Sequence, residues 1–154
     1  MADRSTELDF LDGIKVVDFT QFEAGPSCTE ALAWFGAEVV KVENPGMGDP
    51  GRRLRKGQPD DDPYYFHMFN ANKKSITVNL KLPKGLDLVK DMLRKADVCV
   101  ENMAPGTIER LGLGYDVVKA LNPGIIYCQV KGFGEGSVIG AKPWARRSWV
   151  PQAG

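Results

Sequence analysis

The sequence predicts an α/β protein, built on a parallel sheet with helices on both faces. Two observations predict this class. Short apolar runs alternate along the chain with segments of helical periodicity, and the runs are nearly continuous, as in strands buried on both faces. The segment 14–43 alone reads as strand, tight loop, helix and strand, which is a complete βαβ unit.

The remaining elements follow the same alternation. In the first unit, we expect Ser27 and Glu30 to form a capping box at the start of the helix, and Gly36 to end it. The glycine-, proline- and charge-rich segment 44–63 is predicted to be a long surface loop. The predicted strands cover 14–19, 39–42, 75–80, 98–100 and 125–130, and the predicted helices cover 27–36, 64–70, 83–95, 107–111 and 115–121.

Composition limits the class of function. The chain has 154 residues with 43% apolar and 26% charged residues, which fits one globular domain. Twenty basic residues balance twenty acidic ones, so no global attraction to nucleic acid or to an anionic membrane is expected. No apolar run approaches the roughly 20 residues of a membrane helix. The acidic N-terminus is unlike a signal peptide, and three widely spaced cysteines indicate buried, reduced thiols in a cytoplasmic protein.

The loop after the first predicted strand is the first candidate site. Gly25 would let a ligand approach the backbone, and the following helix would face a phosphate. The same pattern also fits a routine turn between strand and helix. The loop lacks the GxGxxG spacing, and Glu23 would repel a phosphate placed against it.

Several cations lie near predicted strand ends, where parallel sheets bind ligands. They are either phosphate contacts or solvated surface charges, and Lys131 is the most suggestive, because it follows the last strand. The cations are Arg52, Arg53, Arg55, Lys56, Lys73, Lys74, Lys81, Arg110 and Lys131.

Other catalytic patterns find little support. His67 is the only histidine, and no cysteine or carboxylate near it has metal-ligand spacing, so no metal is expected. Asp18 lies inside a buried strand and is predicted to be a hydrogen-bonded structural acid. No GxSxG elbow is present.

Five segments taken together are more specific than any single motif. They are LDGIKVVDFT, AGPSCTEALAWFGAEVVKVENPGMGD, YYFHMFNANKKSITVNL, DVCVENMAPGTIERLGLGYD and LNPGIIYCQVKGFGEGS. In this order and spacing they closely resemble the N-terminal part of class III CoA-transferases, over about residues 11–137. That family includes formyl-CoA:oxalate CoA-transferase, which is the nearest branch, together with carnitine CoA-transferases and α-methylacyl-CoA racemases.

The resemblance implies a Rossmann-like large domain, here incomplete, which binds coenzyme A. It also implies a smaller second domain, an interlocked homodimer, and acyl-CoA and a small carboxylic acid as substrates. The CoA-contacting positions that it implies are Glu23, Ala24, Asn44, Val78, Asn79, Leu80, Lys81, Asn102, Met103, Ala104, Arg110 and Lys131. Two of them depart from the formyl-CoA transferase branch, which often has Gln in place of Glu23 and Arg in place of Asn44.

The resemblance also bears on catalysis and on the ends of the chain. The family's nucleophilic aspartate attacks the acyl-CoA and is expected beyond residue 154, so the chain has no predicted catalytic residue and is predicted inactive or nearly so. Residues 1–10 are predicted to form a flexible arm, 11–137 the CoA-binding domain, and 138–154 a divergent, irregular tail. An α-methylacyl-CoA racemase fragment and a non-catalytic CoA-binding module are the alternatives.

Overall fold

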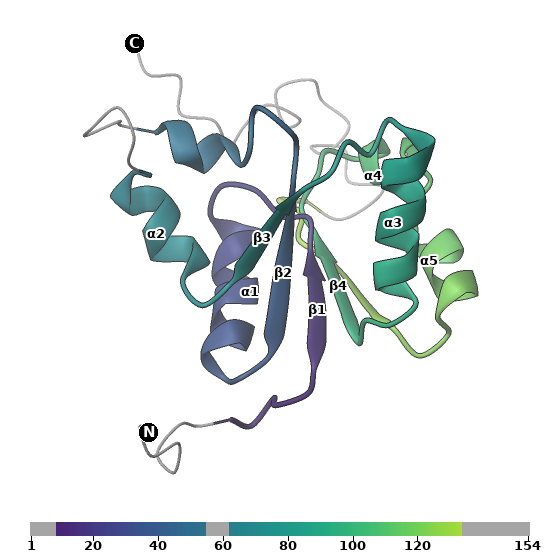
Figure 1. The fold of residues 1–154 in the computed structure, drawn as a ribbon, viewed down its shortest axis with the longest axis horizontal. Coiled ribbons are helices and arrows are strands. Elements are labelled where there is room, and N and C mark those ends of the chain that lie inside the picture. The colour runs from purple at the N-terminus through teal and green to yellow at the C-terminus, as the bar shows by residue number, and fades with distance from the viewer. Residues whose placement is uncertain (1–8, 55–61, 134–154) are drawn as a thin grey trace.

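The computed structural model describes residues 9–54 and 62–133. Within these residues, five strands form one sheet in the order β3-β2-β1-β4-β5, and every neighbouring pair is parallel (Figure 1). This arrangement confirms the predicted α/β class. The strands are β1 (Lys15–Asp18), β2 (Glu38–Glu43), β3 (Lys74–Thr77), β4 (Val98–Glu101) and β5 (Ile126–Gln129).

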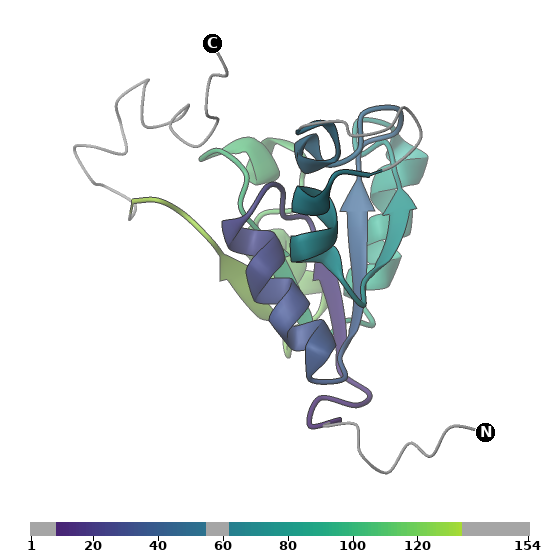
Figure 2. The same cartoon turned by 90° about the vertical axis from the view of Figure 1, so that its left-hand side faces the viewer.

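Helices cover both faces of the sheet (Figures 1 and 2). On one face α1 (Ala24–Trp34) packs against the sheet and against α2 (Tyr64–Asn70). On the other face α3 (Pro83–Leu93) packs beside α5 (Tyr115–Leu121). Two short helices, η1 (Pro50–Arg53) and α4 (Thr107–Arg110), lie at the end of the sheet toward which the strand arrows point.

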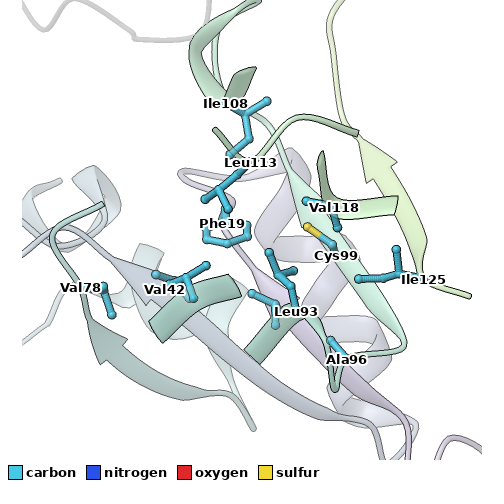
Figure 3. Packing of buried hydrophobic residues seen from close by; sticks show 12 residues of the cluster. Phe19, Val42, Val78, Leu93, Ala96, Cys99, Ile108, Leu113, Val118 and Ile125 are labelled. Atoms are coloured by element: carbon cyan, nitrogen blue, oxygen red, sulfur yellow. The ribbon is translucent and has the colours of Figure 1, made fainter. Parts of the chain in front are cut away.

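The core has one apolar cluster on each face. The larger cluster joins Cys99 of β4 and Phe19, which follows β1, to Val89, Leu93 and Val118 of α3 and α5 (Figure 3). The smaller cluster joins Val16, Val39 and Val100 to Ala33 and Ala37 at the end of α1. Strands β1, β2, β4 and β5 contribute to both clusters by alternation, which accounts for their near-continuous apolar runs in the sequence, whereas β3 contributes Ile76 to the larger cluster.

The chain reverses its direction of travel across the sheet at one point. From β1 it moves outward through β2 to β3, and then α3 carries it back past β1 to β4. Strands β1 and β4 are hydrogen-bonded neighbours, and the chain continues from β1 into α1 on one face and from β4 toward α5 on the other (Figure 1). Such a switch point is where open α/β sheets bind ligands.

The start of α1 was predicted wrongly. The helix begins at Ala24, three residues before the expected cap. Ser27 lies inside it and donates its hydroxyl to the Ala24 carbonyl at 3.1 Å. Glu30 instead accepts a hydrogen bond from the Ala71 backbone at 3.2 Å, so no capping box forms. The end of the helix was predicted correctly, because Gly36 has a φ of 97°.

Smaller differences concern β3, the long loop and the cysteines. Strand β3 ends at Thr77, although Val78 and Leu80 still pack against the core, as their alternation predicted. The predicted loop 44–63 contains the helical turn η1. Cys99 is buried and Cys128 half-buried, but Cys28 is exposed on α1, so the prediction that all three thiols are buried is wrong.

Some predictions fall on residues outside the described ranges. These are the N-terminal arm up to residue 8, the tail 138–154, and the basic residues Arg55 and Lys56. Just after the arm, Phe10 packs on Phe35 with ring centroids 6.4 Å apart. No helix within residues 9–54 and 62–133 has the length and apolar character needed to cross a membrane.

Candidate functional site

The loops that follow the five strands gather at one end of the sheet, which is called the carboxyl edge here. It consists of residues 19–23, 44–49, 78–82, 102–106 and 130–133. In Figure 1 this is the end marked by the strand arrowheads and by α4. All the predicted CoA-contacting residues lie in these loops or in the first turns of the helices beside them.

The loops after β1 and β4 are joined directly at the switch point. The side-chain amide of Asn102 donates to the Gln21 carbonyl at 2.7 Å and accepts from the Gln21 amide at 2.8 Å. This paired contact resembles one rung of a sheet and extends the β1–β4 pairing beyond the strands. Asn102 therefore fixes the separation of the two loops, and one donor and one acceptor position of its side-chain amide are used in doing so.

The loops after β4 and β5 are joined by a buried carboxylate. Glu101, which is fully buried, accepts the Lys131 ammonium at 2.6 Å, the Gln129 side chain at 2.9 Å and the Met103 amide at 2.7 Å. Lys131 also donates to the Met103 carbonyl at 2.7 Å. Its ammonium is thus held beside β4, with 22% of the side chain still exposed.

The turn after β3 presents mainly backbone. Its first amide, on Val78, donates to the Glu43 carbonyl at 2.9 Å, and Asn79 closes the turn by accepting from the Lys81 amide at 3.0 Å. The side chains of Val78 and Leu80 point into the core, so these residues offer only backbone groups to a ligand. Lys81 is exposed and offers its ammonium.

The start of α1 leaves helix N–H groups open. Glu23 occupies the cap position without a side-chain cap bond, and both Glu23 and Ala24 are exposed. Gly25 packs so closely on Thr20 that an added Cβ would lie 2.4 Å from the Thr20 side chain. The glycine thus lets the helix begin directly against the end of β1, with its positive dipole end at the switch point.

Asn44 and Arg110 lie at the two sides of the carboxyl edge, and both are exposed. The Asn44 carbonyl accepts from the amide of Gly48 at 2.8 Å, which closes the turn after β2. Arg110, at the end of α4, donates to the Thr107 hydroxyl at 3.0 Å. Neither contact buries the side-chain amide or guanidinium.

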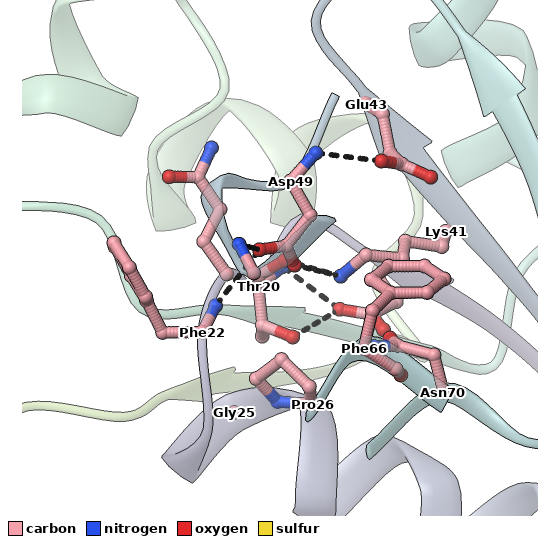
Figure 4. A network of polar contacts seen from close by, with 12 residues as sticks. Thr20, Phe22, Gly25, Pro26, Lys41, Glu43, Asp49, Phe66 and Asn70 are labelled. Carbon is pink, nitrogen blue, oxygen red and sulfur yellow. Dashed lines mark hydrogen bonds and ion pairs between the residues drawn. The ribbon is translucent and has the colours of Figure 1, made fainter. Parts of the chain in front are cut away.

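Sequence reasoning missed a buried polar network beneath the loop after β1 (Figure 4). Lys41 of β2 lies 2.8 Å from Asp49, and each side chain is 1% exposed. The Asp49 Oδ2 atom accepts no hydrogen bond of good geometry and is held by this ion pair. Two features of the sequence could have indicated this pair. Lys41 lies between the valines of a predicted buried strand, and Asp49 precedes Pro50 and Gly51, which is typical of a helix cap.

A second buried pair lies between β1 and α1. As predicted, Asp18 is a structural acid: it accepts from the hydroxyls of Thr20 and Thr29 at 2.5 and 2.6 Å and from Lys73 at 3.2 Å. Lys73 also donates to the Pro26 carbonyl at 2.8 Å. Burial lowers the pKa of the Lys73 ammonium, while the charge of Asp18 acts in the opposite direction.

Two further predicted cations also form internal contacts. Arg52 binds both carboxylate oxygens of Glu43, at 2.6 and 2.8 Å, and its guanidinium lies 3.7 Å from the centroid of the Phe66 ring. Burial alone would raise the pKa of Glu43, but hydrogen bonds from Arg52, Ser75 and the Asp49 amide lower it to about 2. Lys74 pairs with Glu38 at 2.7 Å, at the opposite end of the sheet. Lys74 therefore lies away from the carboxyl edge, and the Arg52 guanidinium is bound to Glu43, with 27% of its side chain exposed.

The described residues offer no obvious metal centre or activated thiol. No group of three or more His, Cys, Asp or Glu residues in ranges 9–54 and 62–133 is placed to hold a metal ion. His67 is exposed, and its ring lies edge-on to Phe66 with centroids 6.3 Å apart. Burial raises the pKa of the Cys99 thiol to about 12, which keeps it protonated and unreactive.

A hollow in the described part of the chain lies away from the predicted residues. It has a volume of about 460 Å³ and opens beside α5 and β5. Two carboxylates, Glu109 and Asp116, line it, and they would repel a phosphate. None of the predicted CoA-contacting residues lines this hollow.

These features define a doubly wound α/β protein in which the loops after all five strands lie at one edge of the sheet, the edge at which open α/β sheets bind ligands. Comparison with known families makes the class specific. A sequence model of the family described as CoA-transferase family III matches residues 11–149, and the chain belongs to this family.

Named relatives agree with that assignment. The chain is 46% identical over 126 residues to a formyl-CoA:oxalate CoA-transferase of Bradyrhizobium sp. (strain ORS 278). It is 46% identical over 125 residues to the enzyme of that name from Escherichia coli O139:H28. These matches cover 82% and 81% of this chain but 30% of each relative. The chain therefore spans about a third of the length of the curated relatives that it matches.

Solved structures support the same fold. A CAIB/BAIF family protein from Brucella suis matches with a TM-score of 0.76 and 37% identity, over 88% of this chain and 35% of that one. A hypothetical protein from Mycobacterium tuberculosis matches with a TM-score of 0.79 and 38% identity, over 88% of this chain and 36% of that one. The predicted resemblance to class III CoA-transferases is thereby confirmed.

Proposed function

We propose that the carboxyl edge binds the coenzyme A part of an acyl-CoA, for transfer of CoA to a carboxylic acid. Formyl-CoA and oxalate are the proposed pair, since the relatives described above carry that name. The observation that carries the proposal is that all residues implied by the family resemblance belong to one edge of the sheet. That edge is the one at which open α/β sheets bind nucleotide-containing ligands.

The edge offers several kinds of group to such a ligand. Backbone amides at the start of α1 and in the turn after β3 can donate to phosphate or carbonyl oxygens. Lys81 and Arg110 are exposed cations that can approach phosphates. Lys131 is shared with Glu101, so its net charge toward a ligand is reduced. We propose that it orients the loop after β5 and contributes one donor rather than a full charge.

Transfer of CoA in this family needs a nucleophile as well as a CoA-binding site. A carboxylate suits the role, because the mixed anhydride that it forms stays reactive toward the returning thiolate. Among the described acids, Asp18, Glu43 and Glu101 are buried in structural networks. We propose that none of these three acids is the nucleophile, and we expect the 154-residue chain to bind CoA without measurable turnover.

Calorimetric titration of CoA into the 154-residue chain tests the proposal. We expect saturable binding that Lys81→Ala weakens at least threefold. Lys95→Ala is the matched control, because Lys95 is also an exposed lysine but lies at the opposite end of the sheet. Equal affinity of both variants, or no heat of binding with the wild-type chain, would contradict the proposed site.

An assay of CoA transfer from formyl-CoA to oxalate tests the part of the proposal that concerns catalysis. We expect no product above background from the 154-residue chain at concentrations that saturate binding. Clear turnover would show that residues of this chain supply a nucleophile. Racemisation of a 2-methylacyl-CoA in place of transfer would favour the racemase alternative.

We also propose a homodimer, which the resemblance implies, and a cytoplasmic location, which the three free cysteines support. Several large apolar side chains are exposed among the described residues, including Trp34, Tyr64 and Ile126, at 61%, 94% and 64%. Such exposure supports an interface between chains or with further parts of the protein. Light scattering coupled to size-exclusion chromatography measures the mass, and a monomer at all concentrations would contradict the homodimer.

A further inference from the structure

The buried pair Lys41–Asp49 lies directly beneath the loop that connects β1 to α1 (Figure 4). Lys41 reaches from β2, and Asp49 from the turn before η1, so that their charged atoms are 2.8 Å apart. The amide of Asp49 donates to Glu43 at 2.6 Å, which fixes the aspartate backbone to the end of β2. A pair so fully buried keeps its geometry only if its remaining polar atoms are satisfied.

The other polar atoms of Lys41 and Asp49 bind the backbone of the loop between β1 and α1. The Lys41 ammonium donates to the Thr20 carbonyl at 2.7 Å. The Asp49 Oδ1 atom accepts from the Phe22 amide at 3.2 Å and from the Gly51 amide at 2.7 Å. The pair Lys41–Asp49 therefore holds the backbone by hydrogen bonds at Thr20 and Phe22, on both sides of Gln21.

Phe22 has a backbone conformation that needs such support. Its φ of 67° lies in the left-handed region, which bulky residues rarely adopt. Such a strained conformation persists where several surrounding contacts hold it in place, and strained residues of this kind are common at ligand sites. Phe22 immediately precedes Glu23 and Ala24, so its conformation sets the direction of the first N–H groups of α1.

We propose that Lys41 and Asp49 are positioning residues for coenzyme A binding, because they hold Phe22 in the left-handed conformation that aims the start of α1 at the ligand. This inference rests on the proposed function. Neither side chain touches the ligand, since each is 1% exposed. They act through the backbone of Thr20 and Phe22, and the removal of either should loosen the loop before it loosens the sheet.

A purely structural role predicts something different, namely lower stability with unchanged affinity. Asn122 provides the matched control. Its side-chain amide donates to the carbonyls of Leu93 and Ala96 at 3.1 and 2.7 Å, at the opposite end of the sheet. Asn122→Ala removes two half-buried side-chain hydrogen bonds to backbone without touching the carboxyl edge.

The experiment compares Asp49→Ala, Asp49→Asn and Asn122→Ala with the wild-type 154-residue chain. Calorimetry gives the CoA dissociation constant, and hydrogen exchange followed by NMR gives the protection of the Phe22 and Glu23 amides. We expect Asp49→Ala to weaken CoA binding at least tenfold and to speed exchange of the Phe22 amide. Asp49→Asn keeps an oxygen acceptor for Phe22 and should restore part of the affinity. Asn122→Ala should leave affinity and Phe22 exchange unchanged within twofold.

Each outcome decides a separate question. Wild-type affinity in a folded Asp49→Ala variant, or equal weakening by Asn122→Ala, overturns the positioning role. If Asp49→Ala fails to fold, a folded Asp49→Asn variant decides: threefold or greater weakening supports the role, and unchanged affinity overturns it. If the wild-type chain binds no CoA while Asp49→Ala speeds Phe22 exchange, the proposed function fails and the pair's hold on the loop is supported.

Discussion

The side chain of Asn102 pairs with the backbone of Gln21, with one hydrogen bond in each direction. These residues are 81 positions apart in the sequence, and each follows one of the two strands at the switch point. The contact makes the loops after β1 and β4 one rigid unit. Any ligand that bridges these loops therefore depends on Asn102, even without touching its side chain.

Replacement of Asn102 by alanine should affect both stability and binding. The Gln21 amide and carbonyl lose their partners, which should lower the free energy of unfolding by about 1–3 kcal/mol. Urea denaturation measures this loss. Calorimetry should show weaker CoA binding than for Asn122→Ala, whose lost contacts lie at the other end of the sheet. Unchanged CoA affinity in a destabilised Asn102→Ala variant would separate this contact from the ligand site.

Gly25 should not tolerate even one added methyl group. A Cβ there would lie 2.4 Å from both Cβ and Cγ2 of Thr20, at the start of α1. Gly25→Ala should therefore cost about 1–3 kcal/mol of stability through overpacking, as measured by chemical denaturation. Addition of Thr20→Ser, which removes Cγ2, should recover part of the loss.

Gly124→Ala serves as the control for that test. The nearest atom to its added Cβ is 3.7 Å away, which is ordinary contact. We expect a change within about 0.5 kcal/mol. If Gly25→Ala were equally neutral, the close contact between α1 and the end of β1 would be wrong.

Stability should fall as the pH drops from about 5 toward 2. The pKa of Glu43 is lowered from 4.5 to about 2 in the folded protein, so the folded state binds this proton less readily than the unfolded chain. The stabilisation is fully present above the unfolded pKa and is lost as the pH falls through the folded pKa. The shift corresponds to about 3 kcal/mol.

The measurement is a set of urea midpoints between pH 2 and pH 6 for wild type and Glu43→Gln. The wild type should show the steeper decline, because the variant carries no titrating group at this position. Parallel curves for the two proteins would mean that Arg52 and Ser75 do not hold Glu43 as the structure describes.

The layout of the sheet could be predicted from sequence because it depends on local patterns. Nearly continuous apolar runs such as residues 14–19, which Asp18 interrupts, predict buried strands, and the separation between runs predicts helices on the faces. The start of α1 could not be predicted in this way. Ser27 and Glu30 have ideal capping identities, but the close packing of Gly25 on Thr20 moves the helix start three residues earlier.

The carboxyl edge was predictable as a location, because parallel strands place their ends together. Its internal support was not, because the partners lie far apart in sequence. Lys73 resembles a surface lysine until α1, α2 and β1 enclose it, and then it pairs with Asp18 across 55 positions. Lys41 and Asp49 are closer in sequence, yet only the fold shows that both lie beneath Phe22.

The most direct test of the account is NMR chemical-shift mapping of the 154-residue chain during titration with CoA. We predict that saturable shifts gather at the carboxyl edge. The affected amides should include Glu23, Ala24, Asn44, Asn79, Lys81, Asn102, Met103, Ala104, Arg110 and Lys131. Shifts confined to the opposite end of the sheet, or no shifts in a folded protein at millimolar CoA, would contradict the account.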